Sequence, residues 1–237
     1  MQKPAFIKDK IYHIYNRGVE KRNIFINDKD RYRFIHCLFE FNDEASADNL
    51  FYYFNRKNSE VELQYLKPQR KPRKLLVNIL AFCLMPNHYH FLLQPLREGG
   101  VVRLMQKLGT GYTNYFNKKY GRVGSLFQGR FKAVLVNENS HLLHLPYYIH
   151  CNPLDLKFPE WRNYGSSTSL DWGEAVKFLE KYRWSSYLDY IGKKNFPSVT
   201  QRGFLTELLG GPEQYKEDMI KWLREMDLEK IKDITFE

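Results

Sequence analysis

The segment that most constrains the fold is FCLMPNHYHFLLQ, in which two apolar runs meet at a Pro-Asn turn. Residues 75–84 and 89–93 form the runs and residues 85–87 separate them, which predicts two strands joined by a tight turn. Because side chains alternate along a strand, His88 and His90 lie on one face and their apolar neighbours on the other. Two imidazoles on one face can both reach a divalent metal ion. Histidine pairs at this spacing also occur in ordinary strands, so the neighbouring segments decide.

Three other segments of the chain point to one known family. They are YHIYNRGVEKRNIF, GYTNYFNKKYGRVGSLFQGRFKA and YYIHCNPL, at residues 12–25, 111–133 and 147–154. Together with MPNHYHFLL, they resemble the IS200-like single-tyrosine transposases, which are HUH nucleases and include the REP-associated tyrosine transposases. The resemblance spans roughly residues 5 to 155, about two thirds of the chain. Several motifs in order are far more specific than one histidine pair.

The resemblance implies a set of site residues. In the family, the histidines of the corresponding strand hold a metal ion, and a tyrosine on a late helix attacks DNA. A polar amide or related ligand follows that tyrosine four residues later. Carried onto this chain, the pattern implies Tyr148 as the catalytic residue and Asn152 beside the metal. The implied ion is Mg²⁺ or Mn²⁺, held by His88, His90 and Asn152.

Other residues near these positions remain alternatives. Tyr147 is a second candidate nucleophile, but the residue four positions later is Cys151, so the amide ligand would be lost. His13, on the first strand, is a candidate third ligand; the resemblance places no ligand there, and packing or DNA contact is its other interpretation. His150 is two residues from Tyr148, which turns it to a different face of the helix.

Composition favours nucleic acid as the partner. The chain has 37 Lys and Arg against 27 Asp and Glu, a formal net charge of +10, and 16% aromatic residues. Single-stranded DNA uses both properties, because cations contact its phosphates and aromatic rings stack on its bases. A basic protein without this function is the plain alternative. We therefore predict single-stranded or hairpin DNA as the partner, and the resemblance allows a homodimer.

Cysteine usage and hydropathy predict a cytoplasmic protein. Cys37, Cys83 and Cys151 are widely spaced and form no CxxC pair, which fits a reducing compartment rather than a disulfide framework or a zinc finger. The first residues lack the apolar core of a signal peptide, and no uncharged apolar stretch approaches the roughly 20 residues that cross a bilayer. We expect no membrane contact, and association with the bacterial nucleoid when DNA is bound.

Two basic clusters are candidate DNA contacts. One is KPQRKPRK at residues 67–74, directly before the strand pair, and the other is the glycine-rich stretch 121–132. Glycines let a backbone approach a phosphate closely, and each neutralised phosphate adds to the affinity. A solvated loop and an ordinary glycine turn are the alternatives for the two clusters. The predicted DNA-binding residues are Arg17, Lys71, Arg73, Arg122, Arg130 and Lys132.

Local patterns predict the elements that carry these residues. Residues 11–16 alternate β-branched and aromatic side chains as a first strand, and Asn27 begins a helix with apolar residues at helical spacing. Residues 101–120 predict a long helix that ends at a glycine. Ser140 is expected to cap a later helix, in which Pro146 introduces either a kink or the start of a second helix.

These elements predict an α+β fold. With the resemblance, we expect a ferredoxin-like antiparallel sheet of the HUH nuclease type, covered by helices. Residues 42–74 are interpreted as an extended, partly mobile insertion with one short element near 51–54. We expect a catalytic domain over residues 1–160 and a small, mostly helical C-terminal appendage over residues 161–237.

The resemblance implies transposase-like cleavage of hairpin-associated, single-stranded DNA. The reaction would form a covalent 5′-phosphotyrosine, release a free 3′-hydroxyl and allow rejoining. A domesticated, non-catalytic relative that binds hairpins and regulates is one alternative. A metal-dependent hydrolase that uses water instead of tyrosine is another. Formation of a protein-linked oligonucleotide would separate the three.

Overall fold

A four-stranded sheet at the centre of the molecule organises the chain. The computed structural model describes residues 4–45, 52–55, 60–63, 72–162 and 171–225. The strands are β1 (Ile11–Arg17), β4 (Val77–Leu84), β5 (His88–Pro95) and β6 (Lys132–Val136), and a separate hairpin pairs β2 (Tyr52–Asn55) with β3 (Glu60–Leu63). The main sheet has the order β4-β5-β1-β6, and each neighbouring pair is antiparallel.

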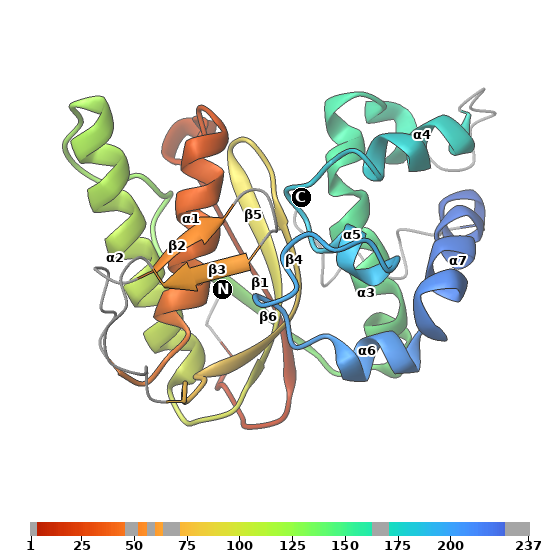
Figure 1. Ribbon diagram of the computed structural model, residues 1–237, viewed down its shortest axis with the longest axis horizontal. Coiled ribbons are helices and arrows are strands. Elements are labelled where there is room, and N and C mark those ends of the chain that lie inside the picture. The colour runs from red at the N-terminus through yellow and green to blue at the C-terminus, as the bar shows by residue number, and fades with distance from the viewer. Residues whose placement is uncertain (1–3, 46–51, 56–59, 64–71, 163–170, 226–237) are drawn as a thin grey trace.

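Helices cover both faces of this sheet. The longer ones are α1 (Asp28–Phe41), α2 (Gly100–Tyr120), α3 (Asn139–Cys151) and α7 (Gly211–Glu225). The shorter ones are α4 (Trp172–Leu179), α5 (Tyr187–Tyr190) and α6 (Gly203–Leu208), with 3-10 turns η1 (Val19–Lys21), η2 (Asn152–Leu156) and η3 (Pro159–Arg162). Figure 1 shows α1 and α2 on one side of the sheet and α3 to α7 on the other. Within the described residues, no helix is long and apolar enough to cross a membrane.

The topology is ferredoxin-like. Without the small hairpin, the order along the chain is β1-α1-β4-β5-α2-β6, and the first strand lies between the third and fourth strands of this series. A β-α-β-β-α-β chain with this strand order is the ferredoxin-like arrangement. The predicted α+β fold class is therefore confirmed, and the histidine strand β5 is one of the two inner strands of the sheet.

The layer formed by α1 and α2 depends on two local features. Asn27 caps α1 through a capping box with Asp30. The Asn27 side chain accepts a hydrogen bond from the backbone N–H of Asp30, and the Asp30 side chain accepts one from the backbone N–H of Asn27. α2 runs unbroken through Gly109 and Gly111. A Cβ atom on Gly111 would lie 2.6 Å from the ring of Phe41 on α1, so this glycine permits the close approach of the two helices.

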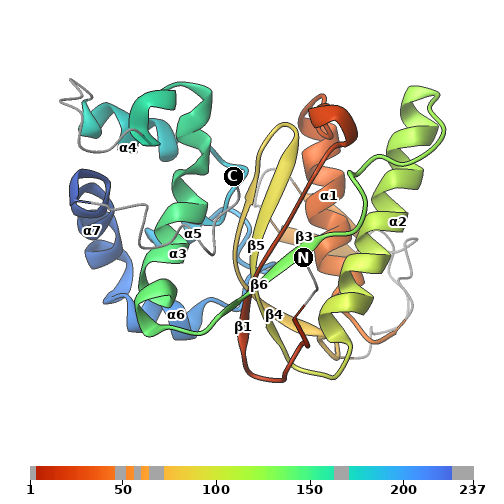
Figure 2. The ribbon, with the colours of Figure 1, turned by 180° about the vertical axis from the view of Figure 1, so that it is seen from behind.

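The opposite face is covered by α3 together with the C-terminal region, and β6 leads directly across to α3 (Figure 2). The C-terminal region also covers the edge strand β4, because Ser186 N donates to Phe82 O at 3.0 Å and Leu84 N donates to Trp184 O at 2.8 Å. These contacts satisfy backbone groups that an exposed edge strand would leave open. The Trp184 to Ser186 segment therefore has a structural role. The predicted boundary after residue 160 stays a prediction.

The start of α3 differs from the prediction. Ser140 does not cap α3: the helix begins at Asn139, with Glu138 in the capping position, because only two residues separate β6 from the helix. Of the two alternatives for Pro146, the start of a second helix is excluded, because this residue lies inside α3. In the insertion, the short element expected near 51–54 is β2, and its partner β3 was not predicted.

Candidate active site

The antiparallel pair β1 and β5 carries the predicted histidine pair. In this register His88 lies opposite Arg17 and His90 lies opposite Tyr15. The rings of His88 and His90 are 5.0 Å apart between centroids and nearly perpendicular, at 87°. Alternation along β5 sends Tyr89 into the core under α1 and α2 and directs both histidines to the face that α3 covers.

A third histidine, His13 from β1, joins this face. Its Nε2 lies 2.9 Å from Nδ1 of His90, and the two rings stack at 5.1 Å between centroids. Both residues are buried. One of the two nitrogens carries the proton and the other accepts it. Because His13 engages Nδ1, His90 would hold an ion through Nε2, and His13 would orient its ring rather than bind the ion.

α3 brings one of its two adjacent tyrosines to the histidines. The Tyr148 ring lies 6.0 Å from that of His90, at 90°, and 6.4 Å from that of His13. Tyr147 points away and stacks on Tyr215 of α7, with 4.6 Å between ring centroids and 10° between planes. Tyr148 is therefore the tyrosine of this pair that faces the histidine strand.

Asn152 follows Tyr148 by one turn and lies at the start of η2. Its Nδ2 donates to the backbone oxygen of Tyr148 at 2.8 Å, and its side chain also hydrogen-bonds His88. Tyr148 and Asn152 therefore lie one turn apart, as their spacing predicts, and Asn152 contacts the first histidine of β5. The amide thus bridges the tyrosine helix and the histidine strand.

Two residues that were not predicted complete the site. Arg162 of η3 places Nη1 3.4 Å from the Tyr148 hydroxyl and Nη2 3.4 Å from Oδ1 of Asn152. Asp155 of η2 accepts from Nε and Nη2 of Arg162, at 2.7 Å each, through its two oxygens. Asp155 directly follows the last of the motifs and Arg162 lies beyond it, so no motif marks them.

Burial keeps the two strand histidines neutral at neutral pH. It lowers the pKa of His88 to about 4, against the opposing effect of Asp155. It also holds the pKa of His90 well below its usual value, and the neighbouring His88 and His13 act in the same direction. Neutral imidazole is the form that offers a lone pair to a metal.

The donor set fits a divalent ion when Asn152 is included. Two neutral imidazoles and one amide oxygen suit Mn²⁺, while Mg²⁺ prefers oxygen ligands. Among the described residues, no group of three or more His, Cys, Asp or Glu is arranged to hold a metal. A metal centre here would therefore depend on the asparagine as well as the histidines.

The predicted DNA-binding residues fall into two groups. Arg17, at the end of β1, lies opposite His88 and hydrogen-bonds Gln128 through Nε. Arg130 is exposed just before β6, and Lys132 is exposed at the first position of that strand. Arg122, two residues after the end of α2, is half-buried and donates to Asn117 at 3.0 Å. These four cations gather around β1, β6 and the loop between α2 and β6.

The other two candidates do not join this group. Arg73 donates to the backbone oxygen of Phe39 at 2.8 Å, and its guanidinium lies 3.7 Å from the centre of the Phe39 ring. These contacts hold it against α1. Lys71 lies outside the described residues, as do Lys67 and Arg70 of the same basic cluster.

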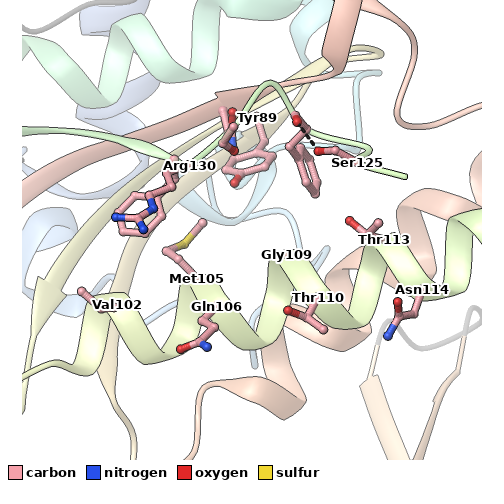
Figure 3. Close-up of a pocket in the computed structure, with 14 residues that line it drawn as sticks. Tyr89, Val102, Met105, Gln106, Gly109, Thr110, Thr113, Asn114, Ser125 and Arg130 are labelled. Carbon is pink, nitrogen blue, oxygen red and sulfur yellow. Dashed lines mark hydrogen bonds between the residues drawn. The ribbon is translucent and has the colours of Figure 1, made fainter. Parts of the chain in front are cut away.

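A groove of about 680 Å³ runs between α2 and the loop before β6 (Figure 3). One wall is the polar face of α2, with Gln106, Gly109, Thr110, Thr113 and Asn114. The facing side includes Tyr89, Ser125 and Arg130. Because Tyr89 and His90 point to opposite faces of β5, this groove and the histidine site lie on different sides of the sheet.

Comparisons with known proteins agree with the motifs in one segment. Residues 62–152 match the family model described as "Transposase IS200 like". A solved structure described as a REP-associated tyrosine transposase bound to a REP hairpin is 13% identical, with a TM-score of 0.49 over 84% of this chain and 89% of that one. No curated protein matches the sequence. Over residues 62–152, the chain is therefore similar to the IS200-like transposases, as its motifs indicate.

Proposed function

We propose that the protein is a transposase-like enzyme that cuts and rejoins single-stranded DNA through a covalent bond to Tyr148. The observation that carries the proposal is the placement of this tyrosine. Its ring faces His90, and the next helical turn sets Asn152 against His88. A nucleophile thus lies beside the three side chains that we propose as metal ligands. The similarity to transposases over residues 62–152 supports the same reaction class.

In the proposed reaction, the oxygen of the Tyr148 hydroxyl attacks the phosphorus of a phosphodiester, and the phenol proton passes to water. The bond between phosphorus and the 3′-oxygen breaks, and that oxygen takes a proton from water. The products are a 5′-phosphotyrosine and a free 3′-hydroxyl. A Mg²⁺ or Mn²⁺ ion held by His88, His90 and Asn152 would offset negative charge on the phosphate. Rejoining reverses these steps.

The cations around β1 and β6 support hairpin DNA as the substrate. Arg17 lies opposite His88 in the sheet, so a strand that it holds would run close to the proposed scissile position. Arg130 and Lys132 extend this positive surface, and Arg130 also lines the groove beside α2. We propose phosphate contacts for these residues and Arg122. The contacts of Arg73 support an anchoring role on α1 instead.

The decisive experiment incubates the protein with labelled single-stranded hairpin DNA and Mn²⁺ or Mg²⁺, then separates products on a denaturing gel. We expect a protein-linked oligonucleotide for the wild type. Tyr148→Phe removes only the hydroxyl, so the variant should bind the hairpin but form no adduct. Tyr147→Phe is the matched control and should form the adduct, because its ring packs against α7.

Four results would contradict the proposal or a part of it. Hairpin binding without any adduct in the wild type would favour the regulatory alternative. Cleavage that survives Tyr148→Phe would favour a hydrolase that uses water. An adduct mapped by mass spectrometry to another tyrosine would remove both Tyr148 and the Asn152 ligand inferred from it. Equal cleavage with and without a chelator would remove the metal.

A further inference from the structure

We infer that Arg162 is a catalytic residue of this site, whose guanidinium stabilises the negative charge that develops on the Tyr148 oxygen and the attacked phosphate. The inference rests on the proposed function, since it assigns a residue to the same reaction. Its basis is direct contact with the atom proposed to react: Nη1 lies 3.4 Å from the Tyr148 hydroxyl. Nothing in the sequence motifs marks this arginine.

Asp155 fixes the orientation of the guanidinium. The carboxylate oxygens accept from Nε and Nη2 at 2.7 Å each, a two-bond pairing along one edge of the planar group. Trp161 donates to the same carboxylate at 2.6 Å and holds it in turn. The remaining nitrogen, Nη1, is the one directed at Tyr148. An arginine held on one edge therefore presents its other edge to the nucleophile.

The environment makes this charge effective. Arg162 is largely buried, and its guanidinium carbon lies 5.4 Å from the centre of the Tyr148 ring. Burial works to lower the pKa of the guanidinium, but hydrogen bonds to Asp155 and the nearby Tyr148 raise it above its usual value. The group is a permanent cation in a site where water screens charge less than in bulk.

The geometry defines what Arg162 does during the attack. Nη1 of Arg162 lies 3.4 Å from the phenol oxygen before the reaction. As Tyr148 gives up its proton to water and bonds to phosphorus, the non-bridging oxygens of the phosphate come within reach of this donor. The same donor stabilises the phenolate that leaves when a 3′-hydroxyl reverses the reaction. Arg162 should therefore assist cleavage and rejoining alike, because both pass through one transition state.

A purely structural role makes a different prediction. Arg162 also donates to Asn152 and so ties η3 to the end of α3. If this were its whole contribution, its loss would reduce stability or hairpin binding together with the reaction. A catalytic role predicts that the rate of adduct formation falls while the melting temperature and hairpin affinity change little.

The test compares Arg162→Ala with Lys157→Ala by the rate of adduct formation on one hairpin substrate. Lys157 is the matched control, because it is a nearby cation whose 2.6 Å ion pair with Glu174 is exposed. Removing one electrostatic donor from an active site slows a reaction by about 10²–10³-fold, which is the loss expected for Arg162→Ala. The control should retain the wild-type rate. Free guanidinium at a non-denaturing concentration should restore part of the Arg162→Ala rate.

Defined results overturn the inference. One such result is a folded Arg162→Ala protein that forms the adduct at the rate of Lys157→Ala. Another is a slower reaction that accompanies weaker hairpin binding and that added guanidinium does not restore. If Arg162→Ala does not fold, Arg162→Lys decides: its ammonium cannot pair with both Asp155 oxygens and still reach Tyr148, so a full rate overturns the inference. Absence of an adduct in the wild type would instead reject the proposed function.

Discussion

Near the proposed nucleophile, His150 joins three parts of the chain through two hydrogen bonds. Its Nδ1 lies 2.7 Å from the Tyr215 hydroxyl of α7, and its Nε2 lies 2.7 Å from Oγ of Ser186. Ser186 Oγ also accepts from Phe82 N of β4 at 2.9 Å. A neutral imidazole satisfies both hydroxyls, and burial lowers its pKa to about 3. This histidine therefore links α3 to α7 and, through Ser186, to the sheet.

We predict that His150 makes the fold sensitive to acid. Because its folded pKa of about 3 is below its usual 6.5, the unfolded chain binds a proton that the folded chain does not. Its contribution is complete above pH 6.5 and is lost as the pH falls toward 3, by about 1.4 kcal/mol per pH unit. Urea unfolding of wild type and His150→Gln should therefore show a smaller dependence on pH for the variant. Equal slopes in this range would contradict the prediction.

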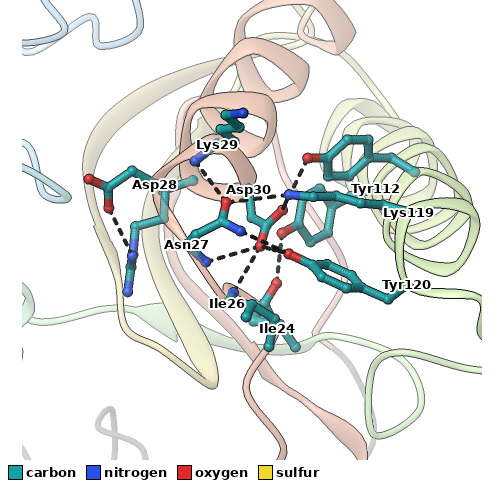
Figure 4. A network of polar contacts seen from close by, with 11 residues as sticks. Ile24, Ile26, Asn27, Asp28, Lys29, Asp30, Tyr112, Lys119 and Tyr120 are labelled. Carbon is teal, nitrogen blue, oxygen red and sulfur yellow. Dashed lines mark hydrogen bonds and ion pairs between the residues drawn. The ribbon is translucent and has the colours of Figure 1, made fainter.

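At the scale of elements, Asp30 connects the start of α1 to the end of α2 (Figure 4). The fully buried carboxylate accepts from the Tyr120 hydroxyl at 2.8 Å and Ile26 N at 2.9 Å, and it pairs with Lys119. Burial alone would raise the pKa of this carboxyl, but the hydrogen bonds from Lys119, Tyr120 and the backbone hold it below its usual value. One residue thus serves both the helix cap and the packing of the two helices.

We predict that Asp30→Asn lowers the free energy of unfolding by about 2–3 kcal/mol, because it removes the charge that several donors share and leaves Lys119 without its carboxylate. Asp28→Asn is the matched control in the same helical turn. Its carboxylate is exposed, and within the described residues its one ion pair is with Arg31, at 3.2 Å. The free energy of unfolding should therefore change by no more than about 0.5 kcal/mol. Similar losses in both variants, measured by chemical denaturation, would contradict the role of Asp30.

At the scale of the whole molecule, two hydrophobic clusters lie on opposite sides of one sheet. The first contains α1, α2 and one face of the strands. The second contains the other face, α3 and buried residues of α4 to α7. The C-terminal region therefore shares a core with the helix that carries Tyr148, which gives it a role in positioning that helix. The chain carries a net charge of +10, which attracts the negatively charged backbone of a nucleic acid.

We predict that the cations around β6 carry much of the salt-dependent DNA affinity. Each phosphate contact contributes about 0.7–0.9 to the slope of log K against log salt, so replacing Arg122, Arg130 and Lys132 with Gln should reduce the slope by about 2–3. A control with the same charge change replaces three exposed lysines of the C-terminal region: Lys193, Lys216 and Lys221. Binding titrations at several salt concentrations measure both. An unchanged slope in the first variant would remove this surface from the proposal.

Local sequence patterns predict most of the elements near the candidate site. Alternation predicted the strand pair and the shared face of His88 and His90, and Asn27 marked the start of α1. Spacing predicted that Tyr148 and Asn152 lie one turn apart. These features depend on residues within a few positions of each other, where backbone geometry limits the outcomes. The start of α3 was less predictable, because the path of the chain out of β6 overrode the capping preference of Ser140.

Contacts between side chains that are distant in the sequence come from the packing of the elements. His13 and His90 are 77 residues apart, and only the pairing of β1 with β5 brings their nitrogens to 2.9 Å. Arg162 reaches Tyr148 because η2 and η3 turn the chain back over α3, a path that its composition does not indicate. Such contacts depend on how whole elements pack, and packing is set by surfaces summed over many residues rather than by any local pattern.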